Sequence, residues 1–158
     1  MRVSEALVDP AVIRPAWRTF EDAVSGLVDH LVAGGRLPRE LAAEAVRRIR
    51  EREAIAGTAM VDIGVSIPHA RLEGIDGIIA AIAVSPDGVY EIAHGLPISI
   101  VVLVLSSPSL TGEHLNFLSA LSLLLQSARV REALRAARTP EEVTRLVRAN
   151  EATPPLGR

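Results

Sequence analysis

The longest apolar stretch of the chain is Ile98-Ser99-Ile100-Val101-Val102-Leu103-Val104-Leu105. A second apolar run, Ile78-Ile79-Ala80-Ala81-Ile82-Ala83-Val84, precedes it, and Gly, Pro and Asp residues bound both. Because both runs are rich in β-branched residues, they predict buried strands. Between them, Pro86-Asp87-Gly88 predicts a turn, and Val89–Ile92 is expected to form a short strand after it.

Helical patterns precede these runs. Apolar residues recur at helical spacing from Phe20 to Val32, and Gly34-Gly35 ends the pattern. A second helix is expected from Pro38 to about Glu53, with the proline near its first turn. The N-terminal part of the chain therefore predicts two helices that lead into the strands.

Helical patterns also follow the two runs. A leucine-rich helix is expected from Thr111 to Leu125, and a short helix from Val130 to Ala137. A last helix is expected to begin after Thr139, an N-cap residue followed by proline, and to end at about Ala149. Helices, then strands, then helices predict one layered α/β domain.

Composition limits the classes of function. The 158 residues fit one domain, with 49% apolar and 23% charged residues. A net charge of −2 gives no basic field for a nucleic-acid partner. The absence of cysteine excludes disulfides, thiolate zinc sites and a cysteine nucleophile. No apolar stretch approaches the about 20 residues that span a bilayer, and no secretory signal is seen, so we expect a cytoplasmic protein without membrane insertion.

One peptide presents a histidine on a stiff backbone. It is Gly64-Val65-Ser66-Ile67-Pro68-His69-Ala70-Arg71, with His69 at the end of a short apolar run. Proline fixes its own φ and restricts Ile67 to an extended conformation. An imidazole held beside the guanidinium of Arg71 suits chemistry on an anion, and phosphate is the obvious candidate.

The other histidines differ in their surroundings. His114 lies in the first turn of the leucine-rich helix, where backbone amides and the helix dipole favour anions. If that helix packs beside the strand, His69 and His114 face one pocket; otherwise they are two unrelated polar residues. His30 is expected at the surface of the first helix, and His94 in a loop as a solvated or turn-bonding residue.

Arg52 allows two interpretations. In Arg50-Glu51-Arg52-Glu53 it belongs either to a solvated, salt-bridged helix face or to a phosphate clamp beside His69. Three histidines and Glu113 also allow a metal site, but their spacing matches no helical zinc motif. The chain contains no G-x-S-x-G, P-loop or G-x-G-x-x-G motif, so we expect neither a serine hydrolase nor a nucleotide or other cofactor site.

Three segments together resemble a known family. They are Arg52-Glu53, the peptide Gly64–Arg71, and Gly112-Glu113-His114-Leu115. They are similar to the enzyme IIA domains of the fructose/mannitol class of the bacterial phosphotransferase system, which includes nitrogen-related regulatory IIA proteins. The resemblance extends from about Leu7 to Ala149, and the I-P-H-A-R element is its specific part.

The resemblance implies a fold and a set of roles. The fold is an α/β single-domain sandwich with a mixed β-sheet flanked by helices, here over residues 1–152, with a flexible tail at 153–158. His69 would accept a phosphoryl group from the phosphocarrier HPr and pass it to a cysteine of a IIB domain or a regulatory target. Arg52 would support the site as a catalytic residue, with His114 as the second histidine. Further phosphate or partner contacts are expected from Arg71, Thr58 and Glu113.

One segment departs from the family pattern. Gly57–Gly64 lacks one hydroxyl residue and one glycine of the usual loop, and Asp62 would oppose phosphate if it faced the pocket. A second hypothesis is therefore a regulatory protein-binding module with weak or no phosphoryl transfer. An alanine after His69, and no attached IIB or IIC segment, favour the regulatory branch over sugar transport.

Overall fold

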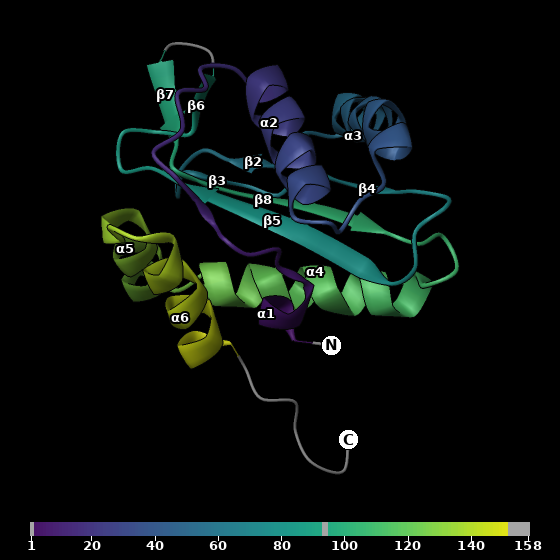
Figure 1. The fold of residues 1–158 in the computed structure, drawn as a ribbon. Coiled ribbons are helices and arrows are strands. Elements are labelled where there is room, and N and C mark those ends of the chain that lie inside the picture. Colours follow the sequence, from purple (N-terminus) through teal and green to yellow (C-terminus); the bar gives the residue numbers. More distant parts are fainter. Residues whose placement is uncertain (1, 93–94, 152–158) are drawn as a thin grey trace.

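A mixed sheet forms the centre of the computed structural model, which describes residues 2–92 and 95–151 (Figure 1). Its two long strands pair antiparallel along their whole length. The shorter strands next to β8 run parallel to it, and the strand on the other side of β5 runs parallel to β5. In sheet order the strands are β1 (Val12–Ile13), β5 (Ile78–Val84), β8 (Ile100–Ser106), β3 (Val65–Ser66) and β2 (Ala59–Met60), with β4 (His69–Arg71) also paired to β8.

The two apolar runs form the central strands, as predicted, and every residue of β5 and β8 is buried. The prediction that Ile98–Leu105 forms one strand is wrong at its beginning. Ser99 separates β8 from β7 (Leu96–Ile98), which pairs with β6 (Tyr90–Ile92) in a second small sheet. The division results from contacts with distant residues, because the Ser99 N–H donates to the Gly64 carbonyl while the Ser99 carbonyl accepts from the Ser85 N–H.

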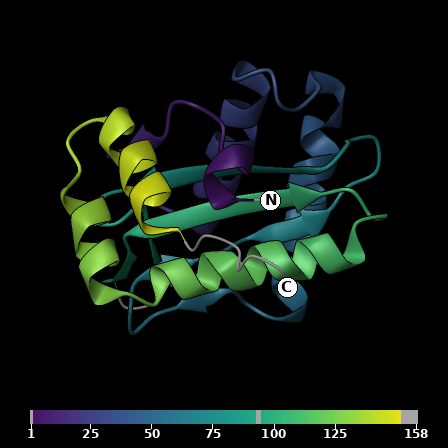
Figure 2. The same cartoon turned by 90° about the horizontal axis from the view of Figure 1, so that it is seen from below.

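Helices cover both faces of the central sheet (Figures 1 and 2). Two helices, α2 and α3, lie on one face, and α4 runs along the other face with α5 and α6 at one end. This arrangement confirms the predicted α/β fold with a mixed sheet flanked by helices. The helices are α1 (Val3–Ala6), α2 (Phe20–Ala33), α3 (Ala42–Ile55), α4 (Thr111–Leu125), α5 (Ala128–Ala136) and α6 (Pro140–Asn150).

Strand β8 connects the two hydrophobic cores. Side chains alternate across a strand, so one set of β8 residues packs under α4 and the other under α2 and α3. Ile100, Val102 and Val104 belong to the core with α4, whereas Val101, Leu103 and Leu105 belong to the core with α2 and α3. A continuous apolar strand is thus explained by burial on both faces.

Threonine caps begin two of the helices, of which the cap at Thr139 was predicted, and one helix start needs correction. Thr19 and Thr139 accept hydrogen bonds from the Asp22 and Glu142 N–H groups at the starts of α2 and α6. The helix expected from Pro38 instead begins with a 3₁₀ turn, η1 (Arg39–Leu41), and α3 continues to Ile55. The Leu41 N–H bonds the Pro38 carbonyl three residues back, which makes this turn tighter than an α-helix.

Some expectations fall outside the structure. His94 and the tail at residues 153–158 lie outside the described residues, so the tail and the boundary at residue 152 stay predictions. Within the described ranges, no helix is both long and apolar enough to cross a membrane.

Candidate functional site

A cleft of about 570 Å³ lies where α3, β4 and the beginning of α4 meet. Helix α3 packs against β4, which is the edge of the sheet that carries His69. The cleft brings together two histidines and three arginines. Its lining residues are Arg48, Glu51, Arg52, Ile55, His69, Ala70, Arg71, His114, Leu115 and Leu118.

His69 is the first residue of β4. The prediction that it ends an apolar strand is wrong, because Pro68 has no N–H to continue the ladder and separates β3 from β4. The Pro68 carbonyl still accepts from the Val104 N–H at 3.0 Å, and His69 pairs with Val104 in parallel register. The imidazole is therefore carried by backbone that is bonded to the central strand.

The His69 ring is oriented by its own peptide. Its Nδ1 lies 2.8 Å from the carbonyl oxygen of Ile67. A carbonyl only accepts hydrogen bonds, so Nδ1 carries the proton and donates it. In the neutral ring, Nε2 then has a free lone pair and is the nucleophilic atom.

His114 faces His69 across the cleft. The two ring centroids are 5.6 Å apart and their planes are inclined by 53°. His114 is 6% exposed, and its Nδ1 lies 2.5 Å from the hydroxyl of Ser106. Burial, followed by electrostatic interactions with Arg71, His69 and Arg52, lowers the pKa of His114 to about 4. His114 is therefore neutral near pH 7.

Two arginines reach the cleft from different elements. Arg52, in the last turn of α3, donates to the carbonyl of Ala56 over 3.4 Å, a long bond that engages one of its five N–H groups. Arg71 donates to the carbonyls of Ser107 and Pro108 at 3.3 and 3.0 Å. The buried Nε of Arg71 has no hydrogen-bond partner among residues 2–92 and 95–151. Arg71 is thus anchored through one terminal nitrogen, and its buried Nε is left unpaired by the described residues.

Thr58 and Glu113 do not line the cleft. The Thr58 N–H and hydroxyl both donate to the carboxylate of Glu53, at 2.7 and 2.9 Å. Glu113 is exposed in the first turn of α4, and the lining residues of that helix begin at His114. Residues 111–113, whose amides were expected to help hold phosphate, are not among the lining residues, and that role stays a prediction.

The unusual segment Gly57–Gly64 also lies outside the lining residues. It forms the β2–β3 hairpin, where Gly64 has a φ of +68° and a Cβ would come within 3.3 Å of the Arg135 guanidinium. Arg135 of α5 donates to the carbonyl of Ile63 and to the hydroxyl of Ser99. Asp62 is exposed on this hairpin and is not among the residues around His69.

The sequence interpretation did not identify an apolar rim around the cleft. Leu115 belongs to the predicted leucine-rich helix, and its side chain is 60% exposed beside His114. Ile55, at the end of α3, is 81% exposed. Helical spacing was an available signal for Ile55, which lies three residues after Arg52. Leu115 directly follows His114, and helical spacing gives no such signal for it.

His30 lies away from the cleft. It belongs to α2, is half-buried rather than fully at the surface, and its Nε2 contacts the carbonyl of Pro10. No group of three or more His, Asp or Glu side chains in the described part of the chain is arranged to hold a metal ion.

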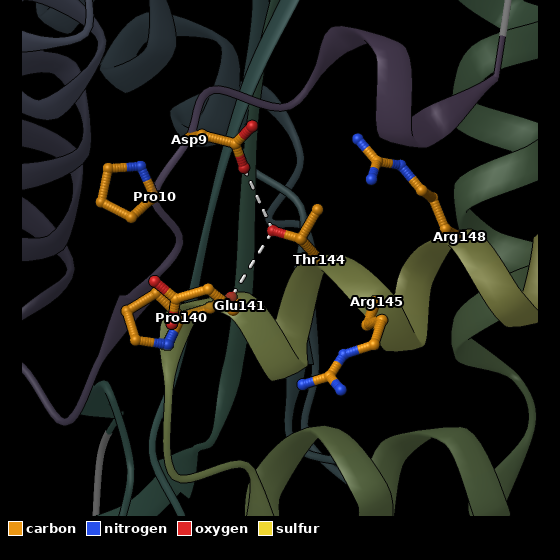
Figure 3. Close-up of a pocket in the computed structure, with 7 residues that line it drawn as sticks. All are labelled: Asp9, Pro10, Pro140, Glu141, Thr144, Arg145 and Arg148. Atoms are coloured by element: carbon orange, nitrogen blue, oxygen red, sulfur yellow. Dashed lines mark hydrogen bonds between the residues drawn. The ribbon is translucent and has the colours of Figure 1, made fainter.

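A second hollow, of about 370 Å³, lies against α6 (Figure 3). The hydroxyl of Thr144 bonds Asp9 at 3.2 Å there, and the Arg145 and Arg148 side chains extend on opposite sides of Thr144. Among the described residues, its lining includes no histidine or other nucleophile of comparable strength. Its lining residues are Asp9, Pro10, Pro140, Glu141, Thr144, Arg145 and Arg148.

Solved structures define the class of protein that has this fold. The nitrogen regulatory protein IIA-Ntr of Neisseria meningitidis matches with a TM-score of 0.77 at 24% identity, over 92% of this chain and 98% of that chain. Enzyme IIAMTL of Escherichia coli, solved in complex with phosphorylated enzyme IIBMTL, matches with a TM-score of 0.66 at 20% identity, over 92% and 95% of the two chains. The fold is that of the enzyme IIA proteins.

Sequence comparison identifies the family. The family described as "Phosphoenolpyruvate-dependent sugar phosphotransferase system, EIIA 2" matches residues 9–150. The fructose-specific EIIA component of the phosphotransferase system of Haloferax volcanii is 33% identical over 127 residues, 79% of this chain and 80% of that protein. The chain belongs to the EIIA type-2 family of phosphoryl carriers, which confirms the resemblance drawn from its motifs.

Proposed function

We propose that Nε2 of His69 accepts a phosphoryl group from phosphorylated HPr and passes it to a IIB domain or holds it as a regulatory state. The hydrogen bond from Nδ1 of His69 to the Ile67 carbonyl carries this proposal. It leaves the Nε2 lone pair free on a ring that lines a cleft with Arg52 and Arg71.

The transfer needs no proton movement at His69. The Nε2 lone pair forms a bond to phosphorus while the bond between phosphorus and its atom in HPr breaks, and that atom leaves with the electron pair. Nδ1 keeps its proton and its bond to Ile67 throughout. Onward transfer reverses these events, with a thiolate of the IIB cysteine as the attacking group. Positioning and charge stabilisation supply the catalysis.

The groups opposite His69 suit a phosphoryl group. The guanidinium groups of Arg52 and Arg71 stabilise negative charge on the phosphoryl oxygens, and both are also close enough to lower the pKa of His114. Neutral His114 adds a hydrogen-bonding group without a further positive charge. We therefore assign catalytic roles in the transfer to His69, Arg52, Arg71 and His114.

The apolar rim suits a protein partner. Ile55 and Leu115 expose large apolar side chains at the cleft. Burial of such side chains in an interface contributes much of the free energy of binding. A partner seated there would also exclude water from the phosphoryl group. The complex of the related IIAMTL with phosphorylated IIBMTL supports a IIB domain as one partner, and the family supports HPr and a cytoplasmic location.

The alternative is a regulatory binding module with weak transfer. It depended on the altered Gly57–Gly64 segment, which is not among the residues that line the cleft. The position of that segment supports the carrier function over the alternative. Onward transfer to a IIB cysteine would indicate the sugar-transport role, and its absence a purely regulatory one.

Phosphorylation from phosphoenolpyruvate, enzyme I and HPr tests the proposal. We expect one acid-labile phosphoryl group per chain, with phosphorus bonded to Nε2 of His69 in an NMR spectrum of the ¹⁵N-labelled ring. His69→Ala should abolish labelling, whereas His30→Ala, the control on α2, should label at the wild-type rate. Labelling that persists in His69→Ala, or no labelling of the wild-type chain, would contradict the assignment.

A further inference from the structure

Ser106 places a hydroxyl in an otherwise apolar row of the sheet. It is the last residue of β8 and is fully buried. Alternation along the strand puts it on the same face as Val102 and Val104, beneath α4. Its hydroxyl lies 2.5 Å from Nδ1 of His114. A buried hydroxyl is costly unless it is hydrogen-bonded, so the direction of this bond matters.

Two directions are chemically possible, and they differ in what they leave unpaired. If Nδ1–H donates to Ser106, the hydroxyl proton needs another acceptor, and the described residues supply only His114 as a partner for this hydroxyl. If the hydroxyl donates to Nδ1, its proton and the Nδ1 lone pair are both satisfied. The second arrangement leaves no buried donor unpaired and is therefore favoured.

We propose that Ser106 is a positioning residue that fixes His114 in the Nε2–H tautomer, so that this N–H donates to a phosphoryl oxygen on His69. The tautomer of His114 does not depend on the proposed function of His69. Only the hydrogen bond from His114 to a phosphoryl oxygen rests on that function. Nothing in the proposal requires His114 to gain or lose a proton during transfer.

The geometry of the two rings agrees with this assignment. Nδ1 of His114 is directed to β8, and the ring also lines the cleft, so Nε2 is the nitrogen available to a ligand there. Its centroid lies 5.6 Å from that of His69, which leaves room for one phosphoryl group bonded to His69 to reach the second ring. Arg52 of α3 and the β4 residues His69 and Arg71 are the charged or titratable groups that disfavour a protonated His114.

The tautomer can be measured directly. In the unphosphorylated full chain with ¹⁵N-labelled histidine, a long-range ¹H–¹⁵N correlation spectrum at pH 7 should show His114 with Nε2 protonated and Nδ1 bare. Ser106→Ala removes the donor and should give a mixture of both tautomers, and Ser106→Thr, which keeps a hydroxyl, should restore the single form. A wild-type ring protonated at Nδ1, or an unchanged ring in Ser106→Ala, would overturn the proposal.

The rate of phosphoryl transfer gives the second readout. We expect Ser106→Ala to slow transfer about tenfold, equivalent to about 1.4 kcal/mol in the barrier, and Ser106→Thr to recover most of the rate. Ser99→Ala is the matched control, because Ser99 is another buried, hydrogen-bonded serine beside β8, about 23 Å along the strand from Ser106. Ser99→Ala should lower stability but leave transfer unchanged.

These measurements separate the two proposals. The tautomer is observed without any phosphoryl donor, so it tests Ser106 even if His69 fails to label. Normal labelling of the wild-type chain with equal rates in wild type and Ser106→Ala would overturn the role of Ser106 alone. Absence of labelling in the wild-type chain would instead overturn the proposed function.

Discussion

The molecule has two polar hollows that each contain arginines, yet their chemistry differs. In the cleft at β4, Arg52 and Arg71 come from different elements and both influence the buried ring of His114. In the hollow at α6, Arg145 and Arg148 belong to one helix, are exposed, and lie on opposite sides of Thr144 (Figure 3).

The difference shows what makes a charged hollow chemically competent. Both hollows contain positively charged arginines. The cleft, unlike the α6 hollow, also contains a nucleophile, His69, whose Nε2 lone pair is left free by the hydrogen bond at Nδ1. The cleft also has an apolar rim that suits a partner, whereas the α6 hollow is lined by prolines, acids and arginines without large apolar side chains. Matched substitutions in the two regions test this comparison.

Removing one arginine from each region should give the largest contrast. Arg52→Gln should slow phosphoryl transfer from HPr by roughly 10²–10³-fold, because a fixed cation on the developing charge is lost. Arg148→Gln should leave the rate unchanged. Single-turnover transfer of labelled phosphate measures both. Equal rates in the two variants would return Arg52 to a solvated helix face.

The stability of the cleft should depend on pH through His114. With its pKa lowered to about 4 in the folded protein, His114 binds fewer protons there than in the unfolded chain, where its pKa is about 6.5. Its contribution to the free energy of unfolding is thus fully present above pH 6.5. It falls by up to about 3 kcal/mol as the pH drops to 4.

Urea unfolding at several pH values between 7 and 4 measures this loss. His114→Gln should show a shallower decline than the wild-type chain, whereas Thr144→Val in the α6 hollow should keep the wild-type slope. If His114→Gln and wild type decline in parallel, the ring does not titrate as the structure indicates.

The apolar rim should contribute to partner binding rather than to chemistry. Leu115→Ser should raise the KM for phosphorylated HPr about tenfold with kcat nearly unchanged, because an interface anchor is lost. Leu123→Ser is the control on the same helix, since Leu123 is 62% exposed but does not line the cleft. A similar KM in both variants would place the docking surface elsewhere.

The smallest effect is expected at Thr58, which does not line the cleft. Thr58→Ala should lower the free energy of unfolding by about 1 kcal/mol, since it removes the hydroxyl bond to Glu53. Phosphoryl transfer should continue at the wild-type rate. Slower transfer in this variant would extend the functional site to the β2–β3 hairpin.

The sequence predicted most of the fold because its signals were local. The two apolar runs form β5 and β8, and the predicted cap at Thr139 marks the start of α6. Proximity of His69 and His114 was one of two alternatives from their positions and was implied by the family resemblance, and the structure brings their rings together. Burial on both faces and helix capping depend on neighbouring residues, which a single sequence displays.

Features that depend on distant contacts were not predictable in this way. The division at Ser99 needs the Gly64 carbonyl, and the hydrogen bond of Ser106 needs α4 to pack beneath β8. Thr58 was expected to contact phosphate or a partner, and in the structure its N–H and hydroxyl donate to the carboxylate of Glu53, five residues earlier. In each case a polar group has several possible partners in the sequence, and packing selects one.

The two rings of the cleft differ in their tolerance of mutation. The His69 ring is held by a main-chain carbonyl, an atom that every possible residue at position 67 still supplies. The His114 ring is held by a side-chain oxygen, which a single substitution of Ser106 removes. Genetic variation can therefore weaken the second ring in one step while the orientation of the first persists, so the nucleophile is the more robust half of the pair.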